Sequence, residues 1–314
     1  MENDVISDTL LSLYHCKMKD GFIFTTIVEP ANAYNAIVIR NPSHCDCWSP
    51  KVLFSKHTLS EHIEYIRQNH IEEAFIIAES IDFLADCPSL KKVSIAPANS
   101  APDRFDYSPL YHLNFDYLHV VTSYGGMNTP FHTTIDYRKL PSLTDLYIDG
   151  TGHEHYADLP SLKSLAIYND KSFVTLPGFK SSASLFSLEI AHSRLQTMNG
   201  ISRYPLKELN LYYNRTLSDV SDIAGLGPSL ERLIIWNCPQ IQDFSFLSQL
   251  THLTHLVLMG SNKLPDVSFV ENMPELKYFK FTMEIVDGNL KPCQRIPLAR
   301  CLKRKRHYNI KLSE

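Results

Sequence analysis

Residues 219–240 read DVSDIAGLGPSLERLIIWNCPQ, and residues 243–264 read DFSFLSQLTHLTHLVLMGSNKL. Both stretches carry the phrase L-x-x-L-x-L, as Leu230/Leu233/Ile235 and as Leu253/Leu256/Leu258. The last two apolar positions alternate as in a β-strand, so their side chains point to the same side of a sheet. One such strand cannot bury its apolar face alone, whereas stacked copies bury a continuous core. The two stretches therefore predict a unit that stacks on copies of itself.

The same phrase extends in both directions from this pair. Clear copies precede it at Leu143/Leu146/Ile148, Leu162/Leu165/Ile167, Leu185/Leu188/Ile190 and Leu206/Leu209/Leu211. Weaker copies stand at Ile71/Ala74/Ile76, Leu90/Val93/Ile95, Phe115/Leu118/Val120 and Leu276/Phe279/Phe281. Successive copies start 19 to 28 residues apart, which is close to the repeat length of about 20–29 residues typical of leucine-rich repeats. Prolines usually come just before the next strand and disfavour long helices in the return segments: Pro141, Pro160, Pro205, Pro228 and Pro274.

From about residue 71 to 285 the chain resembles a leucine-rich-repeat protein, and its repeats look like the short ones of bacterial internalin-like proteins. The resemblance implies an α/β fold: a right-handed curved solenoid with a parallel sheet on its concave face and mostly 3₁₀ or extended chain on its convex side. The family pattern also calls for Asn or Cys three positions after the third apolar residue. Small hydrogen-bonding side chains stand there: Asn214, Cys238, Ser193, Ser261, Thr151 and Asp170.

Both ends of the chain differ from the repeats. We expect residues 1–70 to form an N-terminal cap, with a hairpin near 21–40 and a helix that begins at the capping box Thr58-x-x-Glu61. Residues 286–314 are expected to form a basic C-terminal cap, since solenoids need covered ends. Segment 291–314 carries eight Lys or Arg and one Glu, a net charge of 8 − 1 = +7. The rest of the chain then carries −4 − 7 = −11, so the basic tail has an acidic body to oppose it.

Composition excludes several function classes. No apolar run approaches the roughly 18 residues that span a bilayer, and the first 21 residues do not read as a secretory signal peptide. The seven cysteines are scattered and odd in number, which suits reduced thiols better than a disulfide framework. An acidic body does not suit nucleic acid. We therefore expect a cytoplasmic monomer that binds neither nucleic acid nor a membrane.

Sites for metal or catalysis find little support in the sequence. His44-Cys45-Asp46-Cys47, with His57 further on, offers only one pair of zinc ligands, so a reduced loop is the favoured interpretation. His153-Glu154-His155 lacks the helical-turn spacing of a metalloprotease motif. No nucleophile elbow, phosphate-binding loop or kinase signature is present. We expect no cofactor, no metal and no enzymatic activity.

The register of the phrase identifies the residues that leave the core. Positions flanking the two buried ones point to the concave face, and in the later repeats several of them are large and apolar. We expect this face to bind a partner protein with a basic or apolar patch. The expected apolar anchors are Tyr212, Trp236, Met259, Ile234 and Val257, bordered by Tyr168, Tyr147 and Arg232. Four acidic residues are expected to meet basic groups of the partner: Asp145, Asp149, Glu189 and Glu208.

Alternatives stay open at this stage. Neighbouring loops or the tail could cover the apolar patch and leave it a purely structural surface. If the patch is a binding site, the chain is a non-catalytic interaction module, for example an immunity-type protein or an adaptor. The alternative is a bacterial effector that binds a host protein. The identity of the partner would separate these roles.

Overall fold

A computed structural model gives the fold and describes residues 16–27, 34–40, 57–98, 101–102, 104–122, 134–181 and 183–312. The chain divides into two compact units, residues 1–156 and 157–314, and each is described by itself.

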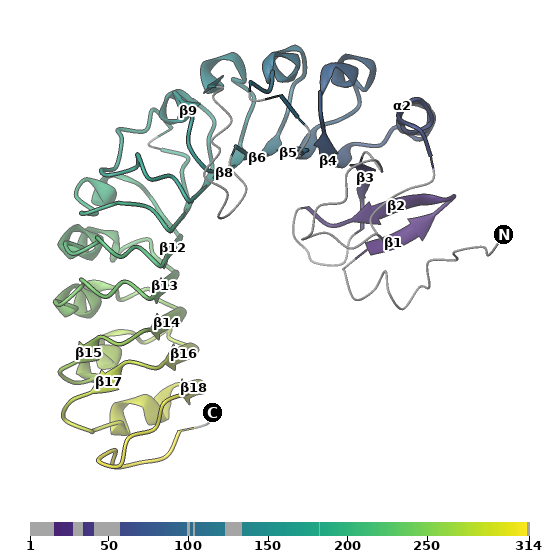
Figure 1. The fold of residues 1–314 in the computed structure, drawn as a ribbon. Coiled ribbons are helices and arrows are strands. Elements are labelled where there is room, and N and C mark those ends of the chain that lie inside the picture. Colours follow the sequence, from purple (N-terminus) through teal and green to yellow (C-terminus); the bar gives the residue numbers. More distant parts are fainter. Residues whose placement is uncertain are drawn as a thin grey trace. The chain divides into compact units, whose positions relative to one another are not determined.

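Unit 1 contains a sheet that begins antiparallel and continues parallel (Figure 1). A hairpin of β1 (Cys16–Lys19) and β2 (Phe22–Thr25) is followed by β3 (Ala36–Arg40), which runs antiparallel to β2. From β3 onward each strand lies parallel to its predecessor: β4 (Glu73–Ala78), β5 (Lys92–Pro97), β6 (Tyr117–Val121) and β8 (Asp145–Asp149). The phrases that start at residues 71, 90, 115 and 143 each supply one of these four strands.

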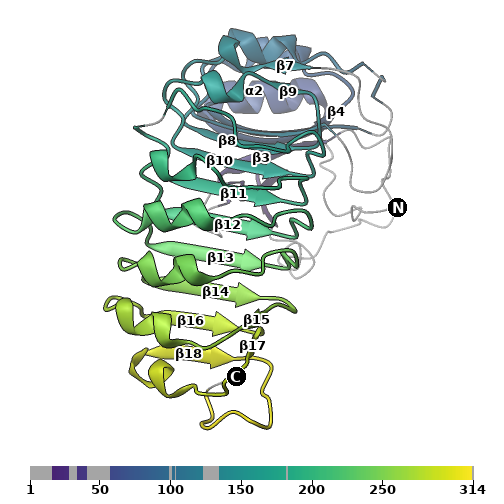
Figure 2. The same ribbon diagram turned by 90° about the vertical axis from the view of Figure 1, so that its left-hand side faces the viewer.

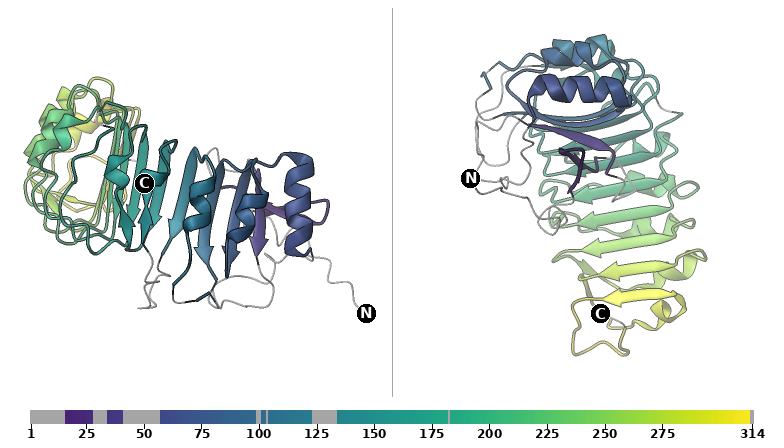
Figure 3. Two further views of the ribbon diagram at one scale, coloured as in Figure 1. Left: turned by 90° about the horizontal axis from the view of Figure 1, so that it is seen from above. Right: turned by 90° about the vertical axis from the view of Figure 1, so that its right-hand side faces the viewer.

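The returns between the strands of unit 1 are helical but short. The capping box predicted at Thr58 and Glu61 is present at the start of α2 (Leu59–Asn69), which buries His62 and Ile66. Single 3₁₀ turns follow on the same side of the sheet as α2 (Figures 1 and 3): η2 (Asp82–Asp86), η3 (Ser108–His112) and η4 (Tyr137–Lys139). Two short parallel strands, β7 (Ile135–Asp136) and β9 (His153–Glu154), pair away from the main sheet.

Unit 2 stacks its strands in chain order, all parallel (Figure 2). They are β10 (Ser164–Tyr168), β11 (Ser187–Ala191), β12 (Glu208–Tyr212), β13 (Arg232–Trp236), β14 (His255–Met259), β16 (Tyr278–Phe281) and β18 (Leu298–Cys301). Their returns are again 3₁₀ turns: η6 (Ile201–Arg203), η7 (Ser221–Leu226), η8 (Ser245–Gln249), η9 (Ser268–Asn272) and η10 (Lys291–Arg295). A turn η5 (Tyr156–Asp158) contains the boundary between the units, and β15 (Lys263–Leu264) pairs with β17 (Glu284–Ile285).

The predicted repeat solenoid is confirmed, because all ten phrases carry a strand and the strands pair in the predicted register. Leu209 lies in register between Leu188 and Leu233, and all three are fully buried. Burying one such side chain contributes roughly 1.5–3 kcal/mol, and each strand contributes two of them to the shared core. The return side is short 3₁₀ turns and extended chain, as the resemblance implied.

The turn after each strand needs a particular backbone conformation and a buried hydrogen-bonding side chain. The residue directly after six strands of the repeats has a positive φ: Gly150, Asn169, His192, Tyr213, Asn237 and Gly260. Directly after Tyr213, the fully buried Asn214 side chain donates to the Ile190 carbonyl at 2.8 Å and accepts from the Ser193 backbone and hydroxyl. The repeat pattern predicts that Ser261 is the hydrogen-bonding side chain of its turn. This prediction is wrong, because Ser261 is exposed and Asn262 is buried instead. Asn262 donates to the carbonyls of Cys238 and Ile241, after an extra residue in the turn at Gly260 (φ 151°).

The basic segment after residue 285 is folded as far as it is described. Ile296, Ala299 and Cys301 are buried and form a degenerate further copy of the phrase, and β18 pairs in parallel with β16. The Tyr308 hydroxyl accepts a hydrogen bond from the Ile285 backbone, and Asn309 donates from its backbone to Gly288. The stacked strands therefore continue beyond the repeats that were recognised in the sequence.

Candidate partner-binding surface

Each strand of unit 2 turns alternate side chains away from the buried core, and we call the surface they form the open face. Three columns run along it, because neighbouring strands pair without a shift in register. The third column contains Tyr168, Ala191, Tyr212, Trp236 and Met259. Nine of the twelve residues predicted to bind a partner belong to unit 2 and lie on this face.

The apolar residues of the open face differ in how much of their surface they expose. The Trp236 side chain is 37% exposed, whereas Ile234 and Met259 expose only 7% and 8%. Ile234 lies between Asn210 and Val257 on the two adjacent strands, and these neighbours cover it. Trp236 and the half-buried Tyr212 are therefore the apolar groups that a partner could reach most readily. The role of Ile234 and Met259 as anchors stays a prediction.

An aromatic cluster surrounds Trp236. Its ring lies 6.2 Å from that of Tyr213 and 6.3 Å from that of Tyr212, and Tyr213 in turn stacks on His192 at 4.8 Å. Tyr213 has a φ of 55°, a left-handed conformation that costs a bulky residue about 1–3 kcal/mol. Sequence reasoning missed Tyr213 and His192. The signal that could have found them is their position directly after the strand, where the other turns carry Asn or Gly.

The acidic residues of the open face are not all available to a partner. The Glu189 carboxylate accepts hydrogen bonds from the Tyr168 hydroxyl and from Asn210 Nδ2, the latter at 3.0 Å. Burial raises the pKa of Glu189, with the Asn210 hydrogen bond and Arg232 opposing this effect. Glu208 is exposed and lies in register beside Arg232. Of these two carboxylates, Glu208 is the one that a partner could contact directly.

A cavity of about 350 Å³ opens on this face beside Trp236. Its lining comes from β12, β13, β14 and β16: Tyr212, Arg232, Ile234, Trp236, His255, Val257, Tyr278 and Lys280. The His255 and Tyr278 rings stack at 5.8 Å along one side of it. Five of the predicted partner-binding residues thus share one hollow with three side chains that were not singled out: His255, Tyr278 and Lys280.

The other three predicted residues belong to unit 1. Tyr147 packs edge-on against His119 at 4.4 Å, and Asp145 accepts a hydrogen bond from the Thr144 hydroxyl at 2.6 Å. Asp145 and Asp149 are both half-buried at the two ends of β8. Their contacts with a partner stay a prediction.

The N-terminal hairpin occupies part of the equivalent face in unit 1. Cys16 and Ile23 pack with Val38, and Phe75 packs against this group. A cavity of about 370 Å³ remains beside the hairpin, lined in part by Phe75, Ser94, His119 and Tyr147. The Ser94 hydroxyl contacts His119 Nδ1 at 2.8 Å, and burial lowers the pKa of His119 to about 4. This histidine is therefore neutral near pH 7.

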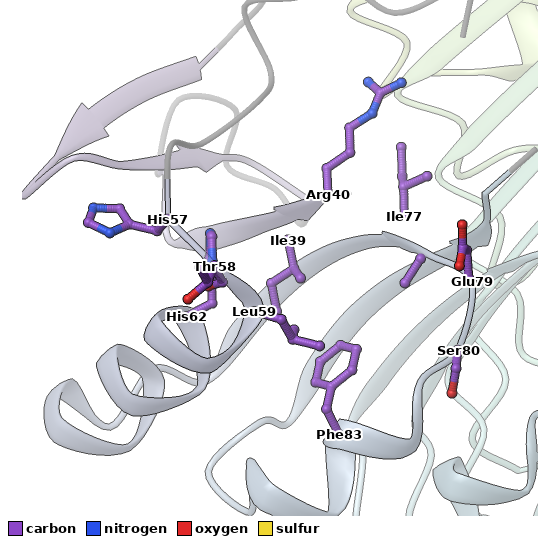
Figure 4. A pocket seen from close by; sticks show the side chains of 11 residues that line it. Ile39, Arg40, His57, Thr58, Leu59, His62, Ile77, Glu79, Ser80 and Phe83 are labelled. Carbon is purple, nitrogen blue, oxygen red and sulfur yellow. The ribbon is translucent and has the colours of Figure 1, made fainter. Parts of the chain in front are cut away.

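A larger cavity of about 520 Å³ lies between α2 and the first parallel strands of unit 1 (Figure 4). Its centre is apolar, with Ile39, Leu59, Ile77 and Phe83, and polar side chains surround it: Arg40, His57, Thr58, Glu79 and Ser80. His57 stacks on Phe22 at 3.9 Å and lies 3.7 Å from the Glu61 carboxylate. The groups around this cavity form no recognisable nucleophile–base pair.

The other sequences considered for chemistry have structural surroundings or lie outside the described residues. The segment His44–Cys47 is outside them. His153 is buried, and its ring nitrogens contact the Tyr137 hydroxyl at 2.8 Å and the Thr122 hydroxyl at 3.3 Å. Among the described residues, no group of three or more His, Cys, Asp or Glu could hold a metal ion. Within that part of the chain, no helix is both long enough and apolar enough to cross a membrane.

Stacked strands that alternate with single 3₁₀ turns, about one per 20–25 residues, define a repeat solenoid of the leucine-rich-repeat class. Residues 228–278 match the family model described as leucine-rich repeats (two copies). The described strands and turns thus have the fold of a leucine-rich-repeat solenoid, and residues 228–278 carry the sequence pattern of that family. Such repeats generally serve as non-catalytic modules that bind other proteins.

Several solved structures are similar to part of this chain, at low sequence identity. An internalin, InlF of Listeria monocytogenes, is 16% identical with a TM-score of 0.42, covering 81% of this chain and 91% of that one. The functional domain of InlJ from Listeria monocytogenes is 16% identical with a TM-score of 0.44, covering 77% and 58%. The leucine-rich-repeat domain of the type III effector XCV3220 (XopL) is 18% identical with a TM-score of 0.38, covering 81% and 77%. A comparison with curated protein sequences gives no significant match.

Proposed function

We propose that the protein is a non-catalytic interaction module that binds a partner protein on the open face of unit 2. The observation that carries the proposal is the exposure of Trp236 among Tyr212 and Tyr213 at the edge of a cavity. Large apolar side chains held together in water are costly unless a partner covers them, and Trp, Tyr and Arg are the usual hot-spot residues of interfaces.

The backbone of the cluster supports the same proposal. Tyr213 keeps a left-handed conformation where Asn169 and Asn237 occupy the equivalent turns at lower cost. Retaining Tyr there places its ring against Trp236 and His192. A strained position that serves to extend an exposed aromatic surface is typical of a binding site.

The charged residues complete the proposed contacts. In unit 2, Glu208 would meet a basic group of the partner and Arg232 an acidic one. Contacts of Asp145 and Asp149 in unit 1 with basic groups of a partner stay a separate prediction. Rim charges of this kind affect the association rate more than the affinity. A cytoplasmic, monomeric protein of bacterial type is part of the proposal, and the buried thiols of Cys87, Cys238, Cys293 and Cys301 support a reducing compartment.

The test is a comparison of two aromatic truncations. Trp236→Ala should weaken binding of the partner captured from native lysate by about 2 kcal/mol or more, the usual hot-spot threshold, without lowering the melting temperature. Phe186→Ala is the matched control, because Phe186 is 39% exposed and lies before β11, outside the three columns. If folded Trp236→Ala binds that partner as tightly as the control, the proposal is wrong. The identity of the captured protein separates an immunity-type or adaptor role from a host-directed effector.

A further inference from the structure

The cavity beside Trp236 is lined by five hydrogen-bond donors that have no acceptor among the described side chains. They are the Arg232 guanidinium, the Lys280 ammonium, the Trp236 indole and the hydroxyls of Tyr212 and Tyr278. In the part of the chain that the structure describes, none of these five groups makes a side-chain hydrogen bond or an ion pair. No carboxylate lines the cavity. Donors gathered without an acceptor point to an anionic occupant.

Neighbouring positive charge strengthens this conclusion. Lys280 lies in register beside Arg300 of β18, so two cations face each other across adjacent strands, an unfavourable arrangement without a counter-charge. Arg300 Nε is buried and has no hydrogen-bond partner. Some other lysines of unit 2 form ion pairs: Lys207 with Glu231 at 2.9 Å, and Lys263 and Lys305 with Glu284. Lys280 makes no such ion pair among the described residues, and Glu208, the carboxylate beside Arg232, does not line the cavity.

The aromatic rings, together with the two cations, limit which ligands the cavity could bind. Rings such as Tyr212, Trp236 and Tyr278 can cage a cation, but Arg232 and Lys280 would repel one. The floor of the cavity is apolar at Ile234 and Val257, which suits a side chain next to the anion rather than the anion itself. A long polyanion such as nucleic acid would meet Glu208 directly beside Arg232. A short acidic stretch avoids that repulsion.

We propose that this basic, aromatic-walled cavity receives an acidic segment of the partner protein, with an Asp or Glu carboxylate between Arg232 and Lys280 and an apolar or aromatic neighbour on Ile234, Val257 and Trp236. The inference rests on the proposed function, which says only that a protein binds this face. It differs from the expectation of a basic partner, because Glu189 and Glu208 of the open face do not line the cavity, whereas Arg232 and Lys280 do. The partner segment therefore carries negative charge where it meets β13–β16.

The experiment is an anisotropy titration of the full-length protein with a fluorescent random copolymer of Glu and Tyr. The double variant Arg232→Ala/Lys280→Ala should raise Kd by about tenfold or more, since hydrogen bonds between charged groups are the strong ones. Arg203→Ala/Lys291→Ala removes the same two charges from 3₁₀ turns and should bind like the unmodified protein. Arg232→Lys keeps the charge and should recover most of the affinity. Added salt should weaken the complex, and circular dichroism and melting curves check that each variant is folded.

Equal copolymer affinities for the folded cavity variant and the control variant would overturn the inference. So would a single-stranded oligonucleotide that binds more tightly than the copolymer and depends on the same two residues, because the site would then be one for phosphates. Binding of the partner captured from lysate separates a failure of this inference from a failure of the proposed function. Loss of that partner in Trp236→Ala but not in the charge variant leaves the proposed function standing and removes this inference. Retention of it in both variants removes the proposed function itself.

Discussion

Single buried polar side chains stabilise the turns between repeats. Asn214 has no exposed surface, and its amide satisfies the Ile190 carbonyl, the Ser193 backbone N–H and the Ser193 hydroxyl at once. Backbone groups that lose such a partner inside a protein have no water to replace it. One side chain thus connects two neighbouring repeats.

We expect Asn214→Ala to lower the free energy of unfolding by about 2 kcal/mol, because it leaves buried donors and acceptors unsatisfied. Urea unfolding monitored by circular dichroism measures the change. Asn199→Ala provides the control, since the Asn199 side chain is exposed. Equal stability of the two variants would show that the Asn214 hydrogen bonds contribute nothing.

Buried histidines in unit 1 predict an acid-sensitive fold. Burial lowers the pKa of His153 to about 3 and that of His119 to about 4, from an ordinary value of 6.5. Between pH 6.5 and these values the unfolded chain binds protons that the folded chain does not, so stability is fully present above pH 6.5 and is lost as the pH falls. Each such histidine should decrease the folding equilibrium constant by about tenfold per pH unit in that window.

Urea unfolding at a series of pH values between 7.5 and 4 (about one unit apart) tests this expectation. His153→Gln should be less stable near pH 7.5 and should show a shallower dependence on pH. The exposed His255, changed to Gln, should leave the dependence as it is. A slope that is the same in all three proteins would contradict the assignment of a neutral buried His153.

At the scale of one repeat, the strand is stabilised by its two core positions and not by its open-face residues. In β12, Leu209 and Leu211 are fully buried, whereas the preceding residue Glu208, on the open face of the same strand, is exposed. The adjacent strands place Leu188 and Leu233 against Leu209. A charged side chain placed at position 209 would therefore have neither water nor a counter-ion beside it.

Leu209→Asp should therefore destabilise the protein by about 4 kcal/mol or more, as expected for an unpaired charge in a core. Glu208→Asp places the same side chain one residue earlier on the exposed side and should change stability little. Thermal unfolding compares the two variants. A melting temperature of Leu209→Asp within error of the control would refute the assigned register.

At the scale of the whole molecule, the C-terminal segment covers the edge of β16 and adds the last strand of the sheet. β18 receives the backbone hydrogen bonds of β16, and Arg295 donates to the carbonyls of Val270 and Met273. Leu298 and Leu302 also donate from their backbones to Lys277 and Phe281. An uncovered edge strand is a template for association with another chain.

Deletion of residues 291–314 should expose the edge of β16 and produce aggregates on size-exclusion chromatography with light scattering. Deletion of residues 311–314 serves as the control, because it keeps β18, Tyr308 and Asn309 in place. A monomeric protein of unchanged stability after the longer deletion would mean that the segment is not a cap.

The sequence alone determined the repeat, the position of ten strands and the side of the sheet on which each residue lies. These features follow from local periodicity: alternate positions of a strand face opposite sides, and copies of one phrase must stack to bury their apolar residues. The face that carries Tyr212 and Trp236 was predicted correctly for that reason.

Only the tertiary structure decided how accessible and how charged that face is. Ile234 and Met259 are covered, Glu189 is bound by Tyr168 and Asn210, and Arg232 and Lys280 share a cavity without a carboxylate. The structure also shows Asn262 in place of Ser261 and a further strand, β18. Each outcome depends on side chains that come from strands some 20 or more residues apart in the chain. Periodicity says which way a residue points, whereas burial, charge pairing and hydrogen bonding depend on the neighbours that stacking places beside it.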